Sequence, residues 1–595
     1  MIKKLSLLCI FIYVDCFAQI HIGASTPMYV KNQVLYVTGN INLASGSNLY
    51  LRNNSQLLQG TAAASTNSGA GTVSVYQEGT SDNFEYNYWC SPVGAANGAA
   101  GSSNFGITLL NRPVTSINAA PVTILPAGNY NGTALPLSIA SNWIYKLTNA
   151  GSYSQWTFVG AASSIAPGEG FTMKGTSGSD PADPEATGVV NNNGSGRQRY
   201  DFRGRPNDGN ILVSVGTGNA ATLTGNPYPS ALDLNAFLMD PSNSACTRVA
   251  YFWEQDKTVD SHYLSAYRGG YGTYSPGSLG SNGIYVPATF NSYNSDGTLN
   301  TVGTSSGLVI QRKYSPIGQG FLINGNSNGQ VTLKNAHRAF YQEGGALSQF
   351  AKNSKTTDTQ KAQENKQISH IKINTIINNA FTRQLALAFM PEATDGVDPG
   401  LDALNMDEAL PADISFWLDN SRYVIQGVNF DPSKKIPLAV HADKACTLKF
   451  YIPETIDFDA SQKVYLLDEF DSSYHDIKSG SYQVSVAAGI YIDRFKIAFD
   501  SQTLGTAVGS KSSLTLYQEN KSRTLKALNP NHLKFRSFNL YDMTGKTVLT
   551  KKELPQEQVY SFSTAGLSSG VYIAVFLTDE NEKITQKIII FNSGG

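Results

Sequence analysis

Val571-Tyr-Ile-Ala-Val-Phe576 and Ile584-Thr-Gln-Lys-Ile-Ile-Ile-Phe591 are two largely apolar segments near the end of the chain, with the turn Asp579-Glu-Asn581 between them. Both are short, rich in β-branched and aromatic residues and bounded by turn residues, which predicts a pair of β-strands. Upstream, Phe538-Asn-Leu-Tyr541 alternates as a strand does, and Gly545 follows at a position where a tight hairpin often requires a positive φ angle. We therefore expect residues 512–595 to form a small β-sandwich.

Three spaced motifs in this region, at 540–546, 566–573 and 586–590, carry a resemblance to a known family. They resemble the type A C-terminal sorting domain of the type IX secretion system of Bacteroidetes bacteria. The positions that match the family pattern are Tyr541, Gly545, Lys546, Gly566, Gly570, Val571, Tyr572 and Lys587. The resemblance implies recognition by the type IX translocon and its shuttle protein. It also implies that a sortase often removes the domain and joins the new end to anionic lipopolysaccharide.

The N-terminus predicts the same export route. Lys3 and Lys4 precede an apolar core at 5–14, which is too short to span a bilayer. Cys16-Phe-Ala18 supplies small residues before Gln19, so we expect residues 1–18 to be a signal peptide. The alternative is a lipoprotein cysteine at Cys16, which Asp15 disfavours. The expected location is the cell surface or the extracellular space, reached through the periplasm and the outer membrane.

The composition indicates several β-domains. A chain of 595 residues is longer than one core normally organises. Its 54 Gly, 31 Tyr and 27 Phe, with only 15% charged residues, suit an all-β fold of tandem sandwich-like modules joined by turns. The net charge of −1 and the lack of a basic stripe argue against a nucleic-acid partner. No later segment is long and apolar enough to predict a transmembrane span.

One internal similarity divides the middle of the chain. Ala166-Pro-Gly-Glu-Gly-Phe171 resembles Ser315-Pro-Ile-Gly-Gln-Gly-Phe321, and each glycine-rich turn leads into an apolar strand. In both copies a proline-containing turn and an aromatic strand come first, at 88–94 and 143–147 and again at 225–230 and 251–253. We expect two related β-modules at 72–195 and 196–345. The alternative is that Gly-Pro turns recur by chance in a glycine-rich chain.

The composition and the strand patterns of the other segments predict their structures. Short strands with Asn, Ser and Gly turns at 19–71 predict a β-solenoid or a β-meander that caps the first module. Residues 346–367 and 500–511 are predicted linkers because they are polar or small. Successive strand patterns predict a β-sandwich at 368–499. This sandwich and the two modules resemble large flavobacterial surface proteins of unassigned function.

Asp395, Asp398 and Asp402 are the candidate metal ligands, since closely spaced carboxylates in a Gly/Pro loop suit Ca²⁺, which takes six to eight oxygens. The alternative is a solvated loop whose aspartates cap turns. We assign no other cofactor and no catalytic residue, because no nucleophile with an adjacent base stands out. Three cysteines remain after signal cleavage, at positions 90, 246 and 446. Their odd number and wide spacing predict buried free thiols.

Tyr263, Tyr267, Tyr271 and Tyr274 crowd a Gly/Ser-rich segment. They either stack on sugar rings or protein partners, or pack inward and cover the core. We expect a non-enzymatic adhesin or surface-assembly component, and the family resemblance adds gliding motility as a context. One alternative is a carbohydrate-binding or polysaccharide-degrading surface protein, whose hydrolytic form needs two carboxylates across a cleft. Another is an accessory partner of the secretion translocon.

Overall fold

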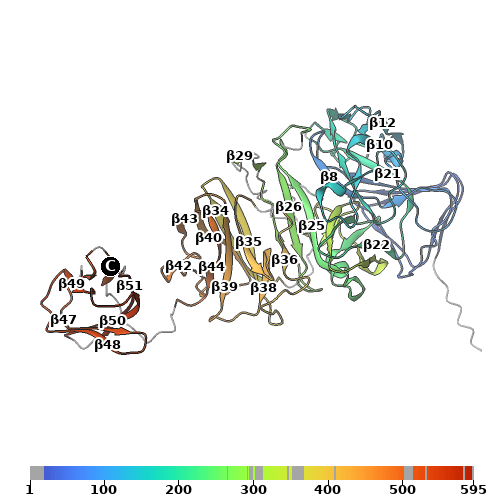
Figure 1. Cartoon of the computed structure of the whole chain (residues 1–595). Helices are drawn as coiled ribbons and strands as arrows, with labels where there is room; N and C mark the ends of the chain where they lie inside the picture. The colour runs from blue at the N-terminus through green and yellow to red at the C-terminus, as the bar shows by residue number, and fades with distance from the viewer. Residues whose placement is uncertain are drawn as a thin grey trace, which may run out of the picture. The chain divides into compact units, whose positions relative to one another are not determined.

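The computed structural model contains two compact units, residues 1–501 and 502–595 (Figure 1). The structure describes residues 19–592 except 195, 264–265, 291, 294–298, 302–311, 345–346, 351–366, 408–409, 502–513, 521, 530–531 and 580–582. The predicted signal peptide and most of both predicted linkers lie outside the described residues. Strands dominate, and α1 (Leu234–Leu238) is the one α-helix in the described part of the chain. The predicted all-β fold class is therefore confirmed.

The segment that begins at residue 19 is a short parallel β-solenoid. β1 (Ile20–Ile22), β2 (Pro27–Lys31) and β3 (Val34–Val37) form the first coil. They pair in parallel with β4 (Ile41–Leu43), β5 (Asn48–Arg52) and β6 (Gln56–Gln59) of the next coil. The strands of a meander would pair antiparallel, so of the two expected arrangements the structure contains the solenoid.

The solenoid continues into the sheet of the first module. β5 pairs in parallel with β7 (Thr72–Glu78), and the sheet order is β11-β10-β21-β7-β5-β2. Its further members are β10 (Leu110–Pro113), β11 (Ala119–Pro121) and β21 (Arg199–Pro206). The module boundary predicted from the sequence, at 195/196, places β21 in the second module. In the structure β21 instead pairs with β7 and β10 of the first module. Packing explains this placement, because Tyr200 and Phe202 of β21 lie against the buried Trp89.

The two copies of the repeated sequence pattern have the same strand pairing. In the first, β8 (Tyr86–Cys90) is antiparallel to β17 (Gly170–Lys174). In the second, β23 (Ala221–Gly225) is antiparallel to β31 (Gly320–Gly325). In each copy, the strand before the proline turn pairs with the strand after the glycine-rich turn.

The glycine-rich turns also join the two modules to each other. Gly168 and Gly318, at equivalent positions of the two turns, have φ angles of 82° and 76°, which favour glycine. The backbone N–H of Cys90 donates to the carbonyl of Gly318 at 2.9 Å. Reciprocally, the Thr224 hydroxyl donates to the carbonyl of Gly168 at 2.7 Å. Each turn is therefore held by the other module.

The second module presents a five-stranded sheet, in the order β23-β31-β25-β26-β27. Its remaining members are β25 (Cys246–Gln255), β26 (Gly269–Ser275) and β27 (Ile284–Val286). Shorter strands complete the two modules: β9 (Val93–Gly94), β12 (Thr123–Leu125), β13 (Gly132–Thr133), β14 (Ser138–Ala140), β15 (Tyr145–Lys146), β16 (Thr157–Phe158), β18 (Thr176–Ser177), β19 (Ser179–Asp180), β20 (Asn192–Asn193), β22 (Ile211–Val215), β24 (Ala231–Asp233), β28 (Ser292–Tyr293), β29 (Leu299–Thr301), β30 (Tyr314–Ser315), β32 (Gly329–Leu333) and β33 (Arg338–Ala339).

Residues 369–498 form one long sheet in the order β42-β41-β44-β39-β37-β38-β35-β34-β40-β43, with β36 paired to β38. Its strands are β34 (Ser369–Ile377), β35 (Phe381–Phe389), β36 (Ala403–Leu404), β37 (Ala412–Leu418), β38 (Ser421–Val428), β39 (Lys435–Ala442), β40 (Cys446–Ile456), β41 (Tyr465–Asp468), β42 (Ser473–Asp476), β43 (Tyr482–Val486) and β44 (Gly489–Ala498).

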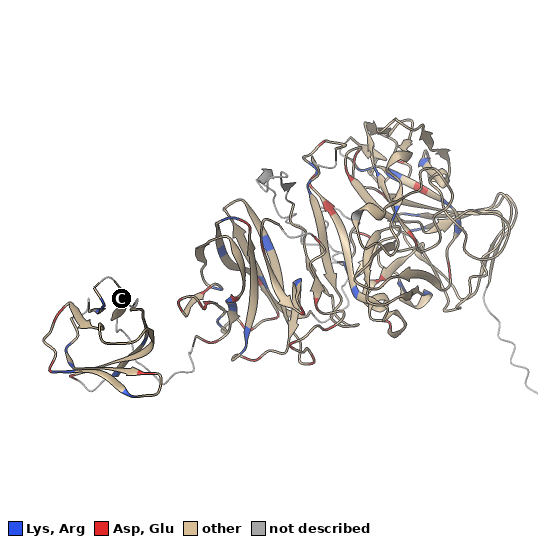
Figure 2. Cartoon of the chain, in the orientation of Figure 1, with Lys and Arg blue, Asp and Glu red and all other residues tan. Residues whose placement is uncertain are grey.

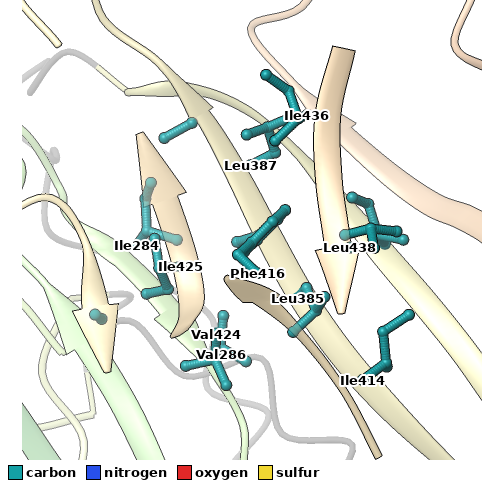
Figure 3. Close-up of a cluster of buried hydrophobic side chains, with 14 of the residues drawn as sticks. Ile284, Val286, Leu385, Leu387, Ile414, Phe416, Val424, Ile425, Ile436 and Leu438 are labelled. Atoms are coloured by element: carbon teal, nitrogen blue, oxygen red, sulfur yellow. The ribbon is translucent and has the colours of Figure 1, made fainter. Parts of the chain in front are cut away.

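The long sheet shares its hydrophobic core with the five-stranded sheet. Ile284 and Val286 of β27 belong to the same buried cluster as Val424 and Ile425 of β38, and Figure 3 shows these side chains together. Hydrogen bonds add to this apolar contact, since the Ser275 hydroxyl lies 2.8 Å from the carbonyl oxygens of both Gly400 and Leu401. The two halves of the long sheet also face each other, since Phe450 of β40 and Phe495 of β44 have ring centroids 5.5 Å apart. Residues 369–498 therefore enclose a core of their own, and this core continues into the five-stranded sheet.

The second unit is a small sandwich of two sheets, β45-β46-β49 and β48-β47-β50-β51. Its strands are β45 (Thr515–Glu519), β46 (Thr524–Leu528), β47 (Phe535–Asp542), β48 (Thr547–Lys552), β49 (Val559–Ser563), β50 (Gly570–Thr578) and β51 (Lys583–Ile590). Phe538 of one sheet stacks on Phe562 of the other, with ring centroids 4.0 Å apart, at the centre of the core. The predicted C-terminal β-sandwich is confirmed.

Three further predictions can be compared with the structure. Cys90, Cys246 and Cys446 are free and buried, as their spacing predicts. None of the helices in the described residues is both long and apolar enough to cross a membrane. On the third prediction, which concerned a basic stripe, Figure 2 shows Lys and Arg residues interspersed with Asp and Glu residues along the strands.

Candidate functional site

An aromatic cleft of about 530 Å³ lies where the two modules meet. Its volume is in the range of small-molecule binding sites. Its lining side chains are mostly half-buried rings. The lining residues are Tyr86, Tyr88, Trp143, Tyr145, Ser154, Trp156, Thr172, Trp253, His262, Tyr267, Gly269 and Tyr271.

Two antiparallel strand pairs, one from each module, supply the walls. In the first module, Tyr88 of β8 stands opposite Thr172 of β17. In the second, Trp253 of β25 stands opposite Tyr271 of β26. Residues directly opposite in an antiparallel pair share one face of the sheet, so each pair presents a row of side chains to the cleft. Glycine at position 269 leaves room for the Trp253 ring, because a Cβ there would lie 2.7 Å from that ring.

Tyr88 connects the two walls. Its ring is stacked on Trp253 at an interplanar angle of 14°, and it meets the edge of Trp156 at 5.9 Å between centroids. Its hydroxyl lies 2.8 Å from the hydroxyl of Tyr271. Aromatic pairs of this kind contribute about 0.5–1.5 kcal/mol each beyond their buried area. The rings are therefore held in fixed orientations before any ligand arrives.

The ammonium group of Lys174 lies behind the other end of the cleft. Its Nζ is 4.0 Å from the ring centroid of Trp143 and 4.9 Å from that of Tyr86. The same atom donates to the Tyr267 hydroxyl and lies 3.2 Å from Nδ1 of His262. Burial lowers the pKa of Lys174 to about 7. Burial, together with this neighbouring ammonium, also lowers the pKa of His262.

Three carboxylates lie close to this end of the cleft without lining it. One oxygen each of Asp82, Glu85 and Asp260 lies within 4.8 Å of the others. Glu85 is buried, and burial raises the pKa of this carboxyl to about 8, an effect that the charge of Asp82 reinforces. Among the described residues that line the cleft, none is Asp or Glu.

The four tyrosines singled out in the sequence separate into three environments. Tyr267 and Tyr271 line the cleft. Tyr274 is fully buried and its hydroxyl donates to Asn235 at 2.5 Å. Tyr263 is 80% exposed. Both expected roles therefore occur, at different positions. The cleft also contains residues that the sequence alone did not indicate as a site, namely Tyr86, Tyr88, Trp143, Trp156, Trp253 and His262. Their one local signal is the alternation Tyr86-Asn-Tyr88, which places both tyrosines on one face of a strand.

The predicted calcium ligands are engaged separately. Asp395 is exposed and pairs with Lys434. Asp398 accepts from the backbone N–H and the hydroxyl of Thr394 at 2.7 and 3.0 Å. Asp402 is buried and accepts from the backbone N–H groups of Asp398 and Gly427 at 2.5 and 2.6 Å. Burial raises the pKa of Asp402 to about 7. Asp398 and Asp402 cap turns of their own loop, whereas Asp395 forms an ion pair. Calcium binding by the three carboxylates stays a prediction.

The sorting-motif residues occupy one sheet of the second unit and its turns. Tyr541 of β47 stands opposite Ile573, which stands opposite Lys587 of β51, so the three lie in one row. The buried Leu540 and Tyr572 alternate with this row, which places it on the outer face of the sheet. Gly570 and Val571 begin β50.

The remaining motif residues lie in turns. Gly545 has a φ of 83° and Lys546 follows it in the turn that Asp542 caps. Gly566 lies in the exposed turn before β50. The motif therefore combines turn glycines and a core tyrosine with exposed side chains that a partner can contact.

A two-sheet β-sandwich with these motifs defines a class of exported protein. Residues 522–591 match the family described as Secretion system C-terminal sorting domain. The chain is thus a substrate of the type IX secretion system, and its destination is the cell surface or the extracellular space. Residues 102–499 match Domain of unknown function (DUF8693), and the chain belongs to that family.

Two solved structures show only weak similarity. One is described as the BSP domain of a biofilm associated protein; it has 7% identity and a TM-score of 0.12, and the match covers 88% of this chain and 96% of that chain. The other is the extracellular domain of a one component system from B. thetaiotaomicron, with 9% identity, a TM-score of 0.11 and coverage of 64% and 62%. None of the curated proteins compared matches the chain.

Proposed function

We propose that this protein is a non-enzymatic surface adhesin that binds an uncharged carbohydrate in the aromatic cleft. The observation that carries the proposal is the set of fixed aromatic rings around a cavity of ligand size. Sugar rings present C–H faces that pack on aromatic faces, and tyrosine hydroxyls and indole N–H groups supply hydrogen bonds at the edges. Export to the cell surface gives such a cleft access to glycans.

The lining supports an uncharged ligand. It contains no Lys, Arg, Asp or Glu among the described residues, and the lowered pKa of His262 favours its neutral form near pH 7. A charged sugar would lose hydration there without gaining an opposite charge. The lining also supports binding over hydrolysis, since glycoside hydrolysis ordinarily uses two carboxylates that flank the bond.

The test is binding of the purified protein to immobilised neutral and acidic polysaccharides. We expect retention on at least one neutral polysaccharide. Trp253→Ala should weaken binding about tenfold, since removing one stacked ring costs about 1–1.5 kcal/mol. Tyr263→Ala is the matched control, because this exposed tyrosine belongs to the same aromatic segment but does not line the cleft.

Two results would count against the proposal. One is equal binding by the Trp253→Ala variant and the wild type. The other is retention on no polysaccharide while a surface protein is captured through the same tryptophan, which would assign the cleft to a protein ligand.

A further inference from the structure

The strongest unassigned feature is the group of three carboxylates beside the cleft. Asp82 and Glu85 belong to the segment that leads into β8, and Asp260 belongs to the connection between β25 and β26. Their closest oxygens lie within 4.8 Å of one another. Glu85 is buried, Asp82 is half-buried and Asp260 is exposed, so the group runs from the interior to solvent.

A second observation shows that the group is incomplete. Glu85 is only 3% exposed, and its Oε1 is buried without a hydrogen-bond partner among the described residues. Its Oε2 accepts from the backbone N–H of Asp82 at 2.9 Å. A buried carboxylate oxygen without a partner is costly, and such atoms in native proteins usually have a bound water or ion. Glu85 therefore has one carboxyl oxygen, Oε1, that is left without a protein partner among the described residues.

The nearby lysines act on these carboxylates through their charge, and that of Lys257 opposes the raised pKa of Glu85, but their ammonium groups hydrogen-bond elsewhere. The Nζ atom of Lys174 contacts Tyr267 and His262, and that of Lys257 donates to the carbonyl of Thr80. Neither ammonium forms an ion pair with the three carboxylates in the described part of the chain.

The spacing of the oxygens suits one hard cation. Oxygens bound to one Ca²⁺ lie about 2.3–2.6 Å from it, so any two of them are at most about 5 Å apart. The segment that carries Asp82 is also anchored, since the backbone N–H of Gly175 donates to the Asp82 carbonyl at 2.7 Å. We infer that Asp82, Glu85 and Asp260 bind a calcium ion, with water completing the shell. Ca²⁺ fits better than Mg²⁺ because ligands from two separate loops give irregular rather than octahedral geometry.

The ion would connect the two sides of the cleft. Glu85 immediately precedes Tyr86, and Asp82 lies four residues before it. Asp260 lies two residues before His262. A cation held by all three carboxylates fastens these segments to each other. Cation binding stands independently of the proposed function; only its effect on carbohydrate binding rests on that function.

Isothermal titration of the purified, chelator-treated full chain with CaCl2 tests the inference. We expect uptake of one ion, with a dissociation constant of about 0.1–1 mM, as is typical of extracellular modules. Glu85→Gln keeps the shape of the buried side chain and should weaken uptake at least about tenfold. The exposed Asp260→Asn should also weaken it and leaves the interior unchanged. Asp395→Asn, in the acidic loop predicted from the sequence, is the matched control and should bind as the wild type does.

Either of two outcomes overturns the inference. One is no heat of binding up to about 10 mM CaCl2, ten times the weakest constant expected. The other is uptake that Glu85→Gln and Asp260→Asn leave unchanged. If Asp395→Asn alone abolishes uptake, the ion belongs to the loop at 394–402. Carbohydrate retention measured in parallel separates the two proposals, since calcium uptake without retention overturns the carbohydrate ligand alone.

Discussion

Lys174 gives a pH-dependent prediction, because its ammonium is enclosed by the rings behind the cleft. Its pKa falls from 10.5 to about 7 on folding. At about 1.4 kcal/mol per pKa unit, protonation in the folded state costs up to about 5 kcal/mol relative to the unfolded chain. The contacts with Trp143 and its neighbours return about 2 kcal/mol. We therefore expect Lys174→Met to stabilise the protein by about 3 kcal/mol at pH 7.

The direction of the pH dependence follows from the linkage between proton binding and folding. Above the unfolded pKa of lysine, Lys174 is neutral in both the folded and the unfolded state, so its burial carries no penalty for desolvating a charge. As pH falls from about 10.5 towards 7, the unfolded chain takes up a proton that the folded chain resists, and stability is lost. The advantage of Lys174→Met should therefore be about 3 kcal/mol at pH 7 and below about 1 kcal/mol at pH 10.

Urea unfolding followed by tryptophan fluorescence measures this difference. All five tryptophans lie in the first unit, so the signal is free of the sorting domain. Lys444→Met, at an exposed lysine, is the control and should change stability by less than about 0.5 kcal/mol. A Lys174→Met variant that is less stable than the wild type at pH 7, or equally stabilised at both pH values, would refute the reasoning.

Three further predictions concern export and stability. Deletion of residues 512–595 should leave the protein in the periplasm, and immunodetection of the truncated chain at normal levels on intact cells would contradict this. Arg338 is fully buried, with its guanidinium 3.3 Å from Asp208, so Arg338→Met should destabilise the first unit by about 3–5 kcal/mol in the same urea assay; a loss below about 1 kcal/mol would show that Asp208 finds another partner or a proton. Gly545→Ala should cost the sorting domain about 1 kcal/mol in calorimetry, because its φ is 83°, whereas Gly566→Ala, in open space, should be neutral.

The sorting domain was predictable because its signals are local. Strand alternation and a turn glycine at 545 depend on neighbours in sequence, and both appear in the structure where the sequence places them. The repeated glycine-rich turns were equally visible, since each occupies a few consecutive residues. Both turns have a positive φ at the equivalent glycine.

The cleft depends on contacts that the sequence does not display. Tyr88 and Trp253 are far apart along the chain and meet only because the two modules exchange contacts through their turns. β21 joins the first sheet for a similar reason, since its aromatic side chains pack on Trp89. The spacing of Asp395, Asp398 and Asp402 suggested a shared ion, but the backbone donors of their own loops engage Asp398 and Asp402. The carboxylates that do lie within 4.8 Å of one another are Asp82, Glu85 and Asp260, and Asp260 comes from a segment that is distant in sequence from the other two.

The common core of the five-stranded sheet and the long sheet has a mechanical consequence for a protein exported to the cell surface or the extracellular space. Tension on the ligand proposed for the cleft would enter through β25 and β26 and pass to the long sheet across a broad apolar interface and the Ser275 hydrogen bonds. Such an interface resists shear through many contacts at once, so the two sheets of the first unit stay together under load.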